Sequence, residues 1–385
     1  MHAALPLSRP HLTGSEQRYI EEALASGKLS GDGPFTKKTS ALLREMLATP
    51  GARRAPHVLL TTSCTSALEL AAVLLHPGRD QRPEVIIPSF TFVSTVNAFL
   101  LHGYRPVFCD VRGDTGNVDA ATIAPHITKS TAVIVPVHYA GVPCDMAPIM
   151  ALARGHGIAV VEDAAQALTS TLDGQQAGTF GDLAAFSFHD TKNFVCGEGG
   201  AVVVNREDLQ LRADIVREKG TNRSQFLQGY IDKYTWIDVG GSFLPSDLLA
   251  AMLLAQLEAR EKIGARRAVL YRRYLSQLLP LADRGILRLP VTPAAVAANH
   301  HLLFVVFKDL DTRTRLMKHL NGQGIQAAFH YPALHTTPMG RTLHEGPDLP
   351  VSVELGECLL RLPLFVDMRD SDVDRVVDAV IHFFA

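Results

Sequence analysis

Short runs of β-branched apolar residues alternate with helix-like stretches over the first two-thirds of the chain. Five of these runs suit buried strands: HVLLTT at 57–62, EVIIP at 84–88, PVFCDV at 106–111, AVIVPVH at 132–138 and IAVVE at 158–162. Helix-like stretches lie between them at 67–75, 92–101 and 146–156. Strands joined through helices pair in parallel, and these runs are apolar on both faces. The pattern therefore predicts an α/β fold with a mainly parallel sheet and helices on both faces.

The pattern of alternating strands and helices changes in the remainder of the chain. Two neighbouring strands are expected at 184–188 and 201–205, on either side of a glycine-rich turn. A long amphipathic stretch begins near Ser246. An α+β pattern follows Pro290, with a strand at 301–307, a helix at 311–322, the segment 325–330 and a helix at 370–384. We therefore expect a large domain over residues 1–250 and a small α+β domain over 251–385, which a long helix reaches.

Composition and charge narrow the class of protein. The 385 residues are 47% hydrophobic, which allows one large core and a second, smaller one. The net charge of −2 gives no basic field for nucleic acid, and the 5 cysteines form no metal-binding pattern. The N-terminus has no signal-like pattern, and no apolar run approaches about 18 residues. We expect a cytoplasmic protein without a metal, nucleic-acid or membrane partner.

Polar residues follow five of the predicted strands. They lie at 63–66 (SCTS), 89–92 (SFTF), 138–141 (HYAG), 163–166 (DAAQ) and 189–193 (HDTKN). Open α/β sheets bind ligands outside the carboxyl ends of their strands. Any one of these segments could be an ordinary turn, but together they predict a cofactor pocket at one edge of the sheet.

The segment Ser63–Ser66 suits a phosphate group. Small hydroxyl residues at the start of a helix leave the first N–H groups free, and the helix dipole favours an anion there. A simple helix N-cap is the alternative. The chain has neither GxGxxG after a strand nor GxxxxGK followed by Ser or Thr. This argues against a nicotinamide dehydrogenase and against a nucleoside-triphosphate enzyme.

Asp163 ends an apolar strand, where a carboxylate is costly unless it is paired. A pyridinium nitrogen is a suitable partner, because the pair keeps the ring protonated and strengthens it as an electron sink. Gln166 could donate to an oxygen on the same ring, and Phe92 offers an apolar face for stacking. The alternatives are a turn cap for Asp163 and an ordinary core position for Phe92.

Lys192 follows a buried-looking strand and precedes the glycine-rich turn at 197–200. Partial desolvation lowers the pKa of a lysine, so that its neutral amine can attack an aldehyde. Taken alone, the position also fits an exposed surface lysine.

These segments together resemble the DegT/DnrJ/EryC1/StrS family of sugar aminotransferases. The similar stretches are TTSCTSALELAA, IIPSFTFVSTVNAFL, PVHYAGVPCDM, VVEDAAQAL, FSFHDTKNFVCGEGGAVVVN and LRLPLF. The resemblance runs from about residue 5 to the end of the chain. It implies the type I fold of aspartate aminotransferase and pyridoxal 5'-phosphate (PLP) as the cofactor. It also implies transamination of a nucleotide-linked keto sugar by a homodimer with shared active sites.

The resemblance also implies roles for single residues. Lys192 is similar to the catalytic lysine that holds PLP covalently, and some relatives with histidine there dehydrate their substrate instead. Asp163 resembles the partner of the ring nitrogen, and Gln166 resembles the contact to the ring oxygen. Further cofactor contacts are implied for Cys64, Thr65, Phe92 and Ser187.

One position departs from the family pattern. Many members have Gly-Tyr-Asn, whose Asn reaches the cofactor phosphate of the neighbouring subunit, whereas this chain has Gly240-Gly241-Ser242. Ser242 could donate one hydrogen bond in its place. Loops outside the cofactor pocket are candidates for substrate contacts, with ordinary surface loops as the alternative; the residues are Lys219, Asn222, Arg223, His330 and Tyr331.

A narrower likeness concerns the substrate. SGKLSGDGPFTKK, REKGTNRSQF and DKYTWIDVGGSFLPSDL resemble the branch that aminates dTDP-4-keto-6-deoxy-D-glucose at C4. L-Glutamate is the usual donor in that branch, and dTDP-4-amino-4,6-dideoxy-D-galactose is the product. A 3-keto or UDP-linked sugar is the alternative substrate. A PLP-binding regulator without turnover is the alternative class of protein.

Overall fold

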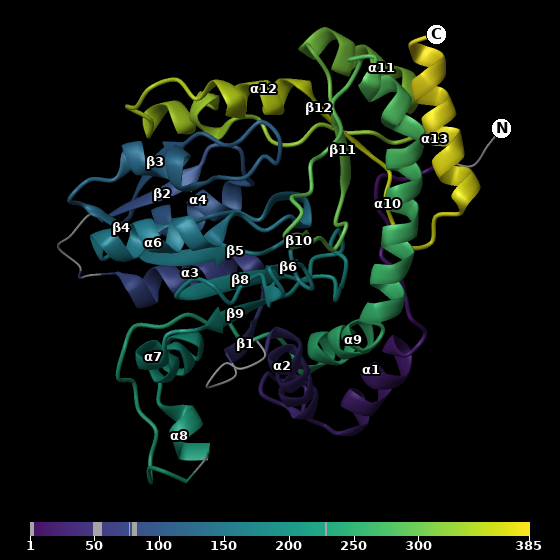
Figure 1. Cartoon of the computed structure of the whole chain (residues 1–385). Coiled ribbons are helices and arrows are strands. Elements are labelled where there is room, and N and C mark those ends of the chain that lie inside the picture. Colours follow the sequence, from purple (N-terminus) through teal and green to yellow (C-terminus); the bar gives the residue numbers. More distant parts are fainter. Residues whose placement is uncertain (1–3, 49–55, 77, 79–82, 228) are drawn as a thin grey trace.

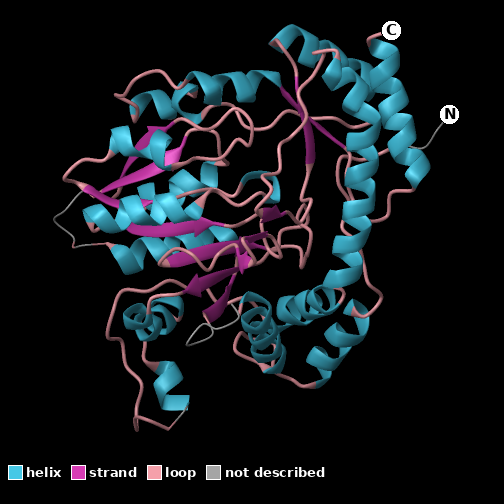
Figure 2. Ribbon diagram, in the orientation of Figure 1, coloured by secondary structure: helices cyan, strands magenta, loops and turns pink. Residues whose placement is uncertain are grey.

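A seven-stranded sheet lies at the centre of the larger part of the molecule (Figures 1 and 2). The computed structural model describes residues 4–48, 56–76, 78, 83–227 and 229–385. The strands lie in the order β1 (His57–Thr61), β9 (Gly200–Val204), β8 (Leu183–Ser187), β5 (Ala159–Asp163), β4 (Thr131–Ile134), β2 (Glu84–Pro88) and β3 (Arg105–Cys109). β9 is antiparallel to both of its neighbours, and the other adjacent pairs are parallel. The predicted mainly parallel sheet is confirmed.

The described helices differ widely in length. They are α1 (Glu16–Ala25), α2 (Pro34–Leu47), α3 (Cys64–Leu75), α4 (Val93–Leu100), α5 (Ala120–Ile123), α6 (Met146–His156), α7 (Glu207–Arg217), α8 (Arg223–Leu227), α9 (Asp247–Glu258), α10 (Arg260–Asp283), α11 (Leu310–Gly322), α12 (Pro350–Cys358) and α13 (Asp370–Phe383). Single 3-10 turns occur at η1 (Ala124–His126), η2 (Tyr139–Gly141), η3 (Leu334–Thr336) and η4 (Gly340–Thr342). Smaller sheets contain β6 (Thr171–Leu172), β7 (Gln175–Gln176), β10 (Val296–Ala297), β11 (Leu303–Val306) and β12 (Leu359–Leu362).

Alternate residues of the central strands face opposite layers of helices. Val85 and Ile87 of β2 pack in one core with α3, α4 and α7. Ile86, which lies between them, packs in another core with α6. Near β1 and β9, α2 and α9 cover the same face as α6. Because side chains alternate along a strand, apolar runs without polar positions bury both faces, as the sequence predicted.

The smaller part of the molecule has its own core. The antiparallel pair β11 and β12 packs with α10, α11 and α13. Leu5 joins this core, and its N–H donates to the Gly324 carbonyl at 2.8 Å. The N-terminal segment therefore lies beside the last helix, as Figure 1 shows.

Two expected elements differ from the structure. The stretch after Ser246 forms two helices, because α9 ends and α10 begins on either side of Ala259. α9 is buried against α1 and α2, whereas α10 leads away to the smaller part, so the chain turns between them (Figure 1). The segment 325–330 makes only isolated bridges, Leu5 with Ile325 and Ala328 with Arg361.

Helix α10 contributes to two cores, one at each end of the helix. Ile263 packs with the core around α2 and α9, and Leu270 packs with the core of the smaller part. The division of the chain at residue 250 stays a prediction. In the part of the chain that the structure describes, no helix combines the length and apolar character needed to cross a membrane.

Candidate active site

A cavity of about 520 Å³ lies at the carboxyl ends of the central strands. Residues from β12 and from the segment after α11 also line it, so the smaller part of the molecule closes one side. Nine of the predicted site residues line this cavity: Cys64, Thr65, Phe92, Asp163, Gln166, Ser187, Lys192, His330 and Tyr331. Four of the five polar segments that were expected to meet at this edge contribute lining residues, namely 63–66, 89–92, 163–166 and 189–193, whereas the segment 138–141 contributes none.

Asp163 places a carboxylate at the end of β5, with only 5% of the residue exposed. Its Oδ2 accepts a hydrogen bond from Thr95 Oγ1 at 2.8 Å, and its Oδ1 accepts one from the Ala165 N–H at 3.1 Å. Among the described residues, no lysine, arginine or histidine forms an ion pair with it. The carboxylate is thus oriented by neutral donors, and its charge remains available to a cationic ligand.

Lys192 lies in the turn that follows β8, and its side chain lines the cavity. Burial lowers the pKa of its amine, while Cys64 and Asp163 oppose this shift by charge and Arg361 adds to it. No described residue forms a hydrogen bond or an ion pair with Nζ. The amine is therefore accessible to a ligand and easier to deprotonate than that of a solvated lysine. Lys192 is therefore not an exposed surface lysine, which was the alternative from the sequence.

Gln166 has a fixed amide orientation. Its Oε1 accepts a hydrogen bond from the Ala140 N–H at 2.7 Å, and its Nε2 donates to the Tyr331 hydroxyl at 3.2 Å. Because Oε1 is occupied by a backbone donor, the NH2 group is the part of the amide that faces the cavity. It can donate to an oxygen on a bound ring.

The start of α3 forms the anion-binding end of the cavity. Ser63 is the N-cap, and its Oγ accepts from the Ser66 N–H at 3.0 Å. The first N–H groups of a helix have no partner within the helix, so those of Cys64 and Thr65 can bind an anion. Gly200 of β9 lies directly against this turn. A Cβ on Gly200 would be 2.3 Å from the Ser63 carbonyl carbon, so only glycine fits this approach.

Phe92 caps α4 and is 56% exposed, so it is not a core residue. Its ring lies 6.0 Å from that of Tyr331, centroid to centroid, on the wall of the cavity. An aromatic face open to a cavity can stack on a planar ligand.

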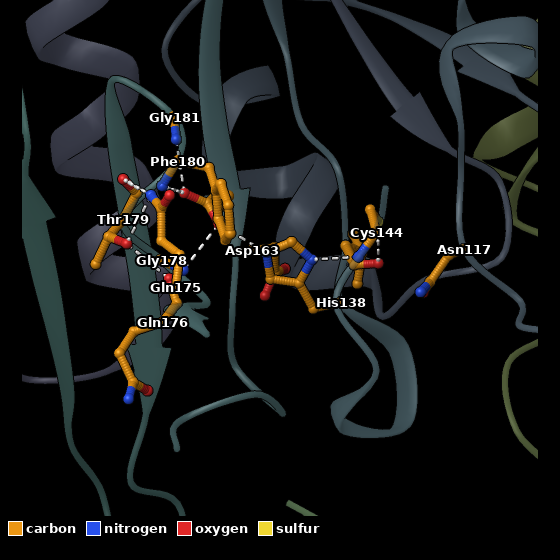
Figure 3. Close-up of polar contacts among 12 residues, drawn as sticks. Asn117, His138, Cys144, Asp163, Gln175, Gln176, Gly178, Thr179, Phe180 and Gly181 are labelled. Carbon is orange, nitrogen blue, oxygen red and sulfur yellow. Dashed lines mark hydrogen bonds and ion pairs between the residues drawn. The ribbon is translucent and has the colours of Figure 1, made fainter. Parts of the chain in front are cut away.

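A buried network supports Asp163 from the far side of β5. The Cys144 N–H donates to His138 Nδ1 at 3.1 Å (Figure 3). His138 Nε2 therefore carries the proton and donates to Glu162 Oε2 at 2.8 Å. The same carboxylate accepts from the backbone N–H groups of Gly178, Phe180 and Gly181, at 2.8, 2.7 and 2.7 Å. Both side chains are fully buried.

This network positions the end of β5. Glu162 immediately precedes Asp163 and points to the opposite face of the sheet. Pro136 and His138 of the neighbouring segment also bond to the backbone of Asp163, at 2.9 and 3.0 Å. The carboxylate of Asp163 therefore projects from a strand end that is fixed on both sides.

Thr95, His301 and Arg361 are among the cavity residues that were not singled out from the sequence. His301 Nδ1 contacts Asn193 Oδ1 at 3.0 Å, next to Lys192 in the chain. Burial, aided by nearby cations, lowers the pKa of His301 well below 6.5. Arg361 lies in the LRLPLF segment. Its place in this segment was the one sequence feature that could have indicated Arg361 as a site residue.

Four predicted residues do not line this cavity: Lys219, Asn222, Arg223 and Ser242. They belong to residues 218–227 and 229–242, called the arm below, which include α8 and project from the body of the molecule (Figure 1). Ser242 bridges Glu218, and Arg223 forms an ion pair with the same residue. Asn222 Oδ1 accepts from the Thr235 N–H at 2.7 Å.

Comparison with known proteins decides the family. The model of the DegT/DnrJ/EryC1/StrS aminotransferase family matches residues 10–381. The chain belongs to this family. Its members use PLP, and the protein is a PLP-dependent sugar aminotransferase with the type I fold.

Solved structures of other aminotransferases are similar over nearly their whole length. TlmJ from Streptoalloteichus hindustanus is 30% identical with a TM-score of 0.88, covering 99% of this chain and 100% of that one. DesI, solved in the presence of its TDP-sugar product, is 30% identical with a TM-score of 0.86, covering 99% and 93%. A protein from Streptococcus pneumoniae, named as a sugar aminotransferase and solved in its PLP form, is 26% identical with a TM-score of 0.85, covering 97% of each chain.

The cavity of this aminotransferase fits PLP chemically. Within the described ranges of the chain, it combines an amine that has no protein partner, a carboxylate that forms no ion pair, and a helix start whose first N–H groups have no partner within the helix. These match the aldehyde, the ring nitrogen and the phosphate of PLP, in that order. The groups sit on Lys192, Asp163 and the Cys64–Thr65 turn.

Proposed function

We propose that this aminotransferase moves the amino group of L-glutamate to C4 of dTDP-4-keto-6-deoxy-D-glucose. The products are dTDP-4-amino-4,6-dideoxy-D-galactose and 2-oxoglutarate. The observation that supports transamination most directly is the presence of Lys192 and Asp163 in one cavity with the α3 helix start. The resemblance of SGKLSGDGPFTKK and REKGTNRSQF to the C4-aminating branch supports the sugar. DesI, which is 30% identical, was solved with a TDP-sugar product. A cytoplasmic location is part of the proposal.

Lys192 carries the proton transfers in this proposal. When bound, PLP supplies an aldehyde that forms imines with amines and a ring that accepts the electrons of a carbanion. The lowered pKa of Lys192 allows Nζ to take the proton from the amino-acid carbon as a base and to return it as an acid. Asp163 keeps a proton on the ring nitrogen by its charge. Donor and acceptor use the same cavity in turn, so we expect ping-pong kinetics.

The remaining cofactor contacts are proposed from their places in the cavity. Cys64 and Thr65 bind the phosphate through the helix start, and Ser187 adds a hydroxyl. Phe92 stacks on the ring, and Gln166 donates to the ring oxygen.

We further propose a homodimer in which the arm reaches the cavity of a second copy. Lys219, Asn222, Arg223 and Ser242 lie on or beside this arm, away from their own cavity, and would contact sugar nucleotide or phosphate there. Tyr230 and Trp236 of the arm are 76% and 77% exposed, as expected of residues that a second copy covers. His330 and Tyr331 would contact the substrate within their own chain.

Product analysis tests the proposal. The PLP-loaded enzyme is incubated with L-glutamate and dTDP-4-keto-6-deoxy-D-glucose, and the new C–N bond is located by NMR. We expect an axial amine at C4 with the galacto configuration. The 3-keto isomer and UDP-linked keto sugars serve as competing substrates, and Lys192→Ala serves as the inactive control. Faster turnover of either competitor would assign a different substrate, and no turnover with any sugar would favour a PLP-binding regulator.

A further inference from the structure

His301 presents one ring nitrogen to the cavity. The residue lies just before β11 and is only 6% exposed, and it lines the cavity wall. Its Nδ1 contacts Asn193 Oδ1 at 3.0 Å. No described residue bonds to Nε2, and protein atoms do not seal this nitrogen off. Nε2 is therefore the ring nitrogen that a ligand can reach.

The contacts of Asn193 fix the tautomer of His301. Asn193 Nδ2 donates to the Asn299 carbonyl at 3.0 Å, so the amide turns its oxygen toward the imidazole. An amide oxygen only accepts hydrogen bonds, so His301 Nδ1 must carry the proton. Burial, aided by nearby cations that include Lys192 and Arg361, lowers the pKa of the ring well below 6.5, so the ring is neutral. Nε2 therefore offers a lone pair and acts as an acceptor only.

This acceptor is held in place from two sides. Arg267 of α10 donates to the carbonyls of His300 and His301, which fixes the backbone. Asn193 fixes the ring, and Asn193 directly follows Lys192 in the chain. The acceptor is thus tied to the turn that carries the reactive amine. Because no described residue uses Nε2, a bound ligand is the remaining source of a donor.

The ligands of the proposed reaction differ in what they can donate to Nε2. PLP has one ring N–H, for which Asp163 is the proposed acceptor, and its other polar atoms are oxygens. L-Glutamate reacts through its amino group, and its two carboxylates only accept hydrogen bonds. The keto sugar has hydroxyl groups beside its reacting carbon. A neutral acceptor in the cavity therefore suits a sugar hydroxyl better than it suits the other two ligands.

We propose that His301 Nε2 accepts a hydrogen bond from the hydroxyl next to the keto carbon of the sugar. In the proposed substrate this is the C3 hydroxyl, and that choice rests on the proposed function. His301 and Lys192 line the same cavity and influence each other by charge. A sugar whose keto carbon faces Lys192 has its neighbouring hydroxyl as the nearest donor. The amine of Lys192 is the competing donor within the chain.

The sugar half-reaction tests this proposal. The pyridoxamine form of the enzyme is mixed with dTDP-4-keto-6-deoxy-D-glucose or with the same sugar lacking its C3 or its C2 hydroxyl, and the cofactor absorbance is followed. His301→Asn keeps an N–H for Asn193 and loses the acceptor. We expect this variant to react with the full sugar about tenfold more slowly at low sugar concentration, as for the loss of one hydrogen bond.

The substrate analogues show which hydroxyl is bound. With the wild type, removal of the C3 hydroxyl should also lower the rate about tenfold. With His301→Asn the same removal should cost nothing more, because both changes remove one contact. The sugar without the C2 hydroxyl should lose as much from His301→Asn as the full sugar does.

Two further variants and a second half-reaction separate binding from structure. His301→Gln can place an amide oxygen near the position of Nε2, so it should recover part of the rate. His300→Asn changes the neighbouring histidine, which does not line the cavity and whose φ of 55° suits asparagine, so it should match the wild type. The half-reaction of His301→Asn with L-glutamate should keep its rate, since no hydroxyl takes part in it.

The outcomes separate this proposal from the proposed function. If the wild type reacts with no keto sugar, the proposed function fails, and the proposal fails with it. If the wild type reacts but removal of the C3 hydroxyl lowers the rates of wild type and His301→Asn by the same factor, only the proposal is overturned. Equal slowing of both half-reactions in His301→Asn would also overturn it, because His301 would then act on Lys192.

The wild type alone carries the test if His301→Asn does not bind PLP. Equal rates with the full sugar and with the sugar lacking the C3 hydroxyl would then overturn the proposal. A tenfold loss that is confined to the C3 hydroxyl, together with partial activity of His301→Gln, would support it.

Discussion

Thr95 Oγ1 donates to Asp163 Oδ2 at 2.8 Å, and this contact joins the first turn of α4 to the end of β5. Thr91 Oγ1 lies 3.0 Å from the same hydroxyl and fixes its rotamer. A threonine leaves the full negative charge on the carboxylate, whereas an arginine or lysine would neutralise it. Asp163 is thus oriented and still able to attract a protonated ring nitrogen.

Thr95→Val tests this contact. Valine has nearly the same shape but no hydroxyl, so Asp163 loses one of its two hydrogen bonds. We expect the Kd for PLP to rise about tenfold, as for the loss of one charge-assisted hydrogen bond. Absorbance titration of the apoenzyme measures it. Thr342→Val, on the exposed η4 turn, is the control; an unchanged Kd in Thr95→Val would show that the contact does not matter.

Lys192→Ala removes the amine that we propose for covalent attachment of PLP and for proton transfer. We expect turnover to fall by at least about a thousandfold, since the variant lacks both a nucleophile and a general base. Circular dichroism should match the wild type, because Nζ forms no bond with the described residues. Reduction with borohydride followed by mass spectrometry should label the wild type at Lys192 and leave the variant unlabelled. Substantial residual turnover would contradict the assignment.

Glu162→Gln tests the network behind Asp163. The carboxylate accepts four hydrogen bonds, three of them from the backbone N–H groups of the 178–181 loop. A glutamine places an NH2 group against some of these donors, so the free energy of unfolding should fall by about 3 kcal/mol. Urea denaturation measures this change. Glu345→Gln, on an exposed loop, should have no effect, and neither variant touches the cavity.

Gly200→Ala tests the close approach of β9 to the α3 helix start. The added Cβ would meet backbone atoms of Ser63 and Cys64, which cannot move without displacing the turn. We expect a loss of about 2 kcal/mol in stability, typical of overpacking, together with weaker phosphate binding. Gly264→Ala is the matched control, because nothing lies within 4 Å of its Cβ position in α10. It should gain about 1 kcal/mol from helix propensity.

The sequence predicted the central sheet well because its strands carry an unambiguous signal. EVIIP at 84–88 is β2 without any shift, and its alternate residues face two helix layers. The break at Ala259 could not be predicted, because both sides of it are good helix formers. Only the packing of α9 against α1 and α2 turns the chain there.

The site was predicted where its residues follow strands of the central sheet. Asp163 is the last residue of β5 and Lys192 lies in the turn that follows β8, and a parallel sheet brings such positions to one edge. Arg361 and His301 enter the cavity from the smaller part of the molecule. No local sequence pattern indicates where this part lies relative to the edge of the sheet. Thr95 looks like any polar residue in the first turns of a helix. Long-range packing, and not local sequence preference, places Thr95, His301 and Arg361 at the cavity.

Stability should depend on His301 below neutral pH. The ring is buried next to Lys192, Arg267 and Arg361, and burial is the main cause of a pKa well below 6.5. The unfolded chain takes up a proton near pH 6.5, and the folded chain does not. The unfolded state therefore binds more protons, and stability falls as the pH drops below about 6.5, by up to about 1.4 kcal/mol per pH unit for this residue.

The measurement compares the wild type with His301→Gln by urea denaturation between pH 7.5 and pH 5.0, a range set by the histidine pKa of about 6.5. We expect the wild type to lose more stability over this range than the variant, because the variant has no imidazole to protonate on unfolding. His156→Gln, at the exposed end of α6, should follow the wild type. Equal losses in the wild type and in His301→Gln would mean that the buried imidazole takes up its proton in the folded state.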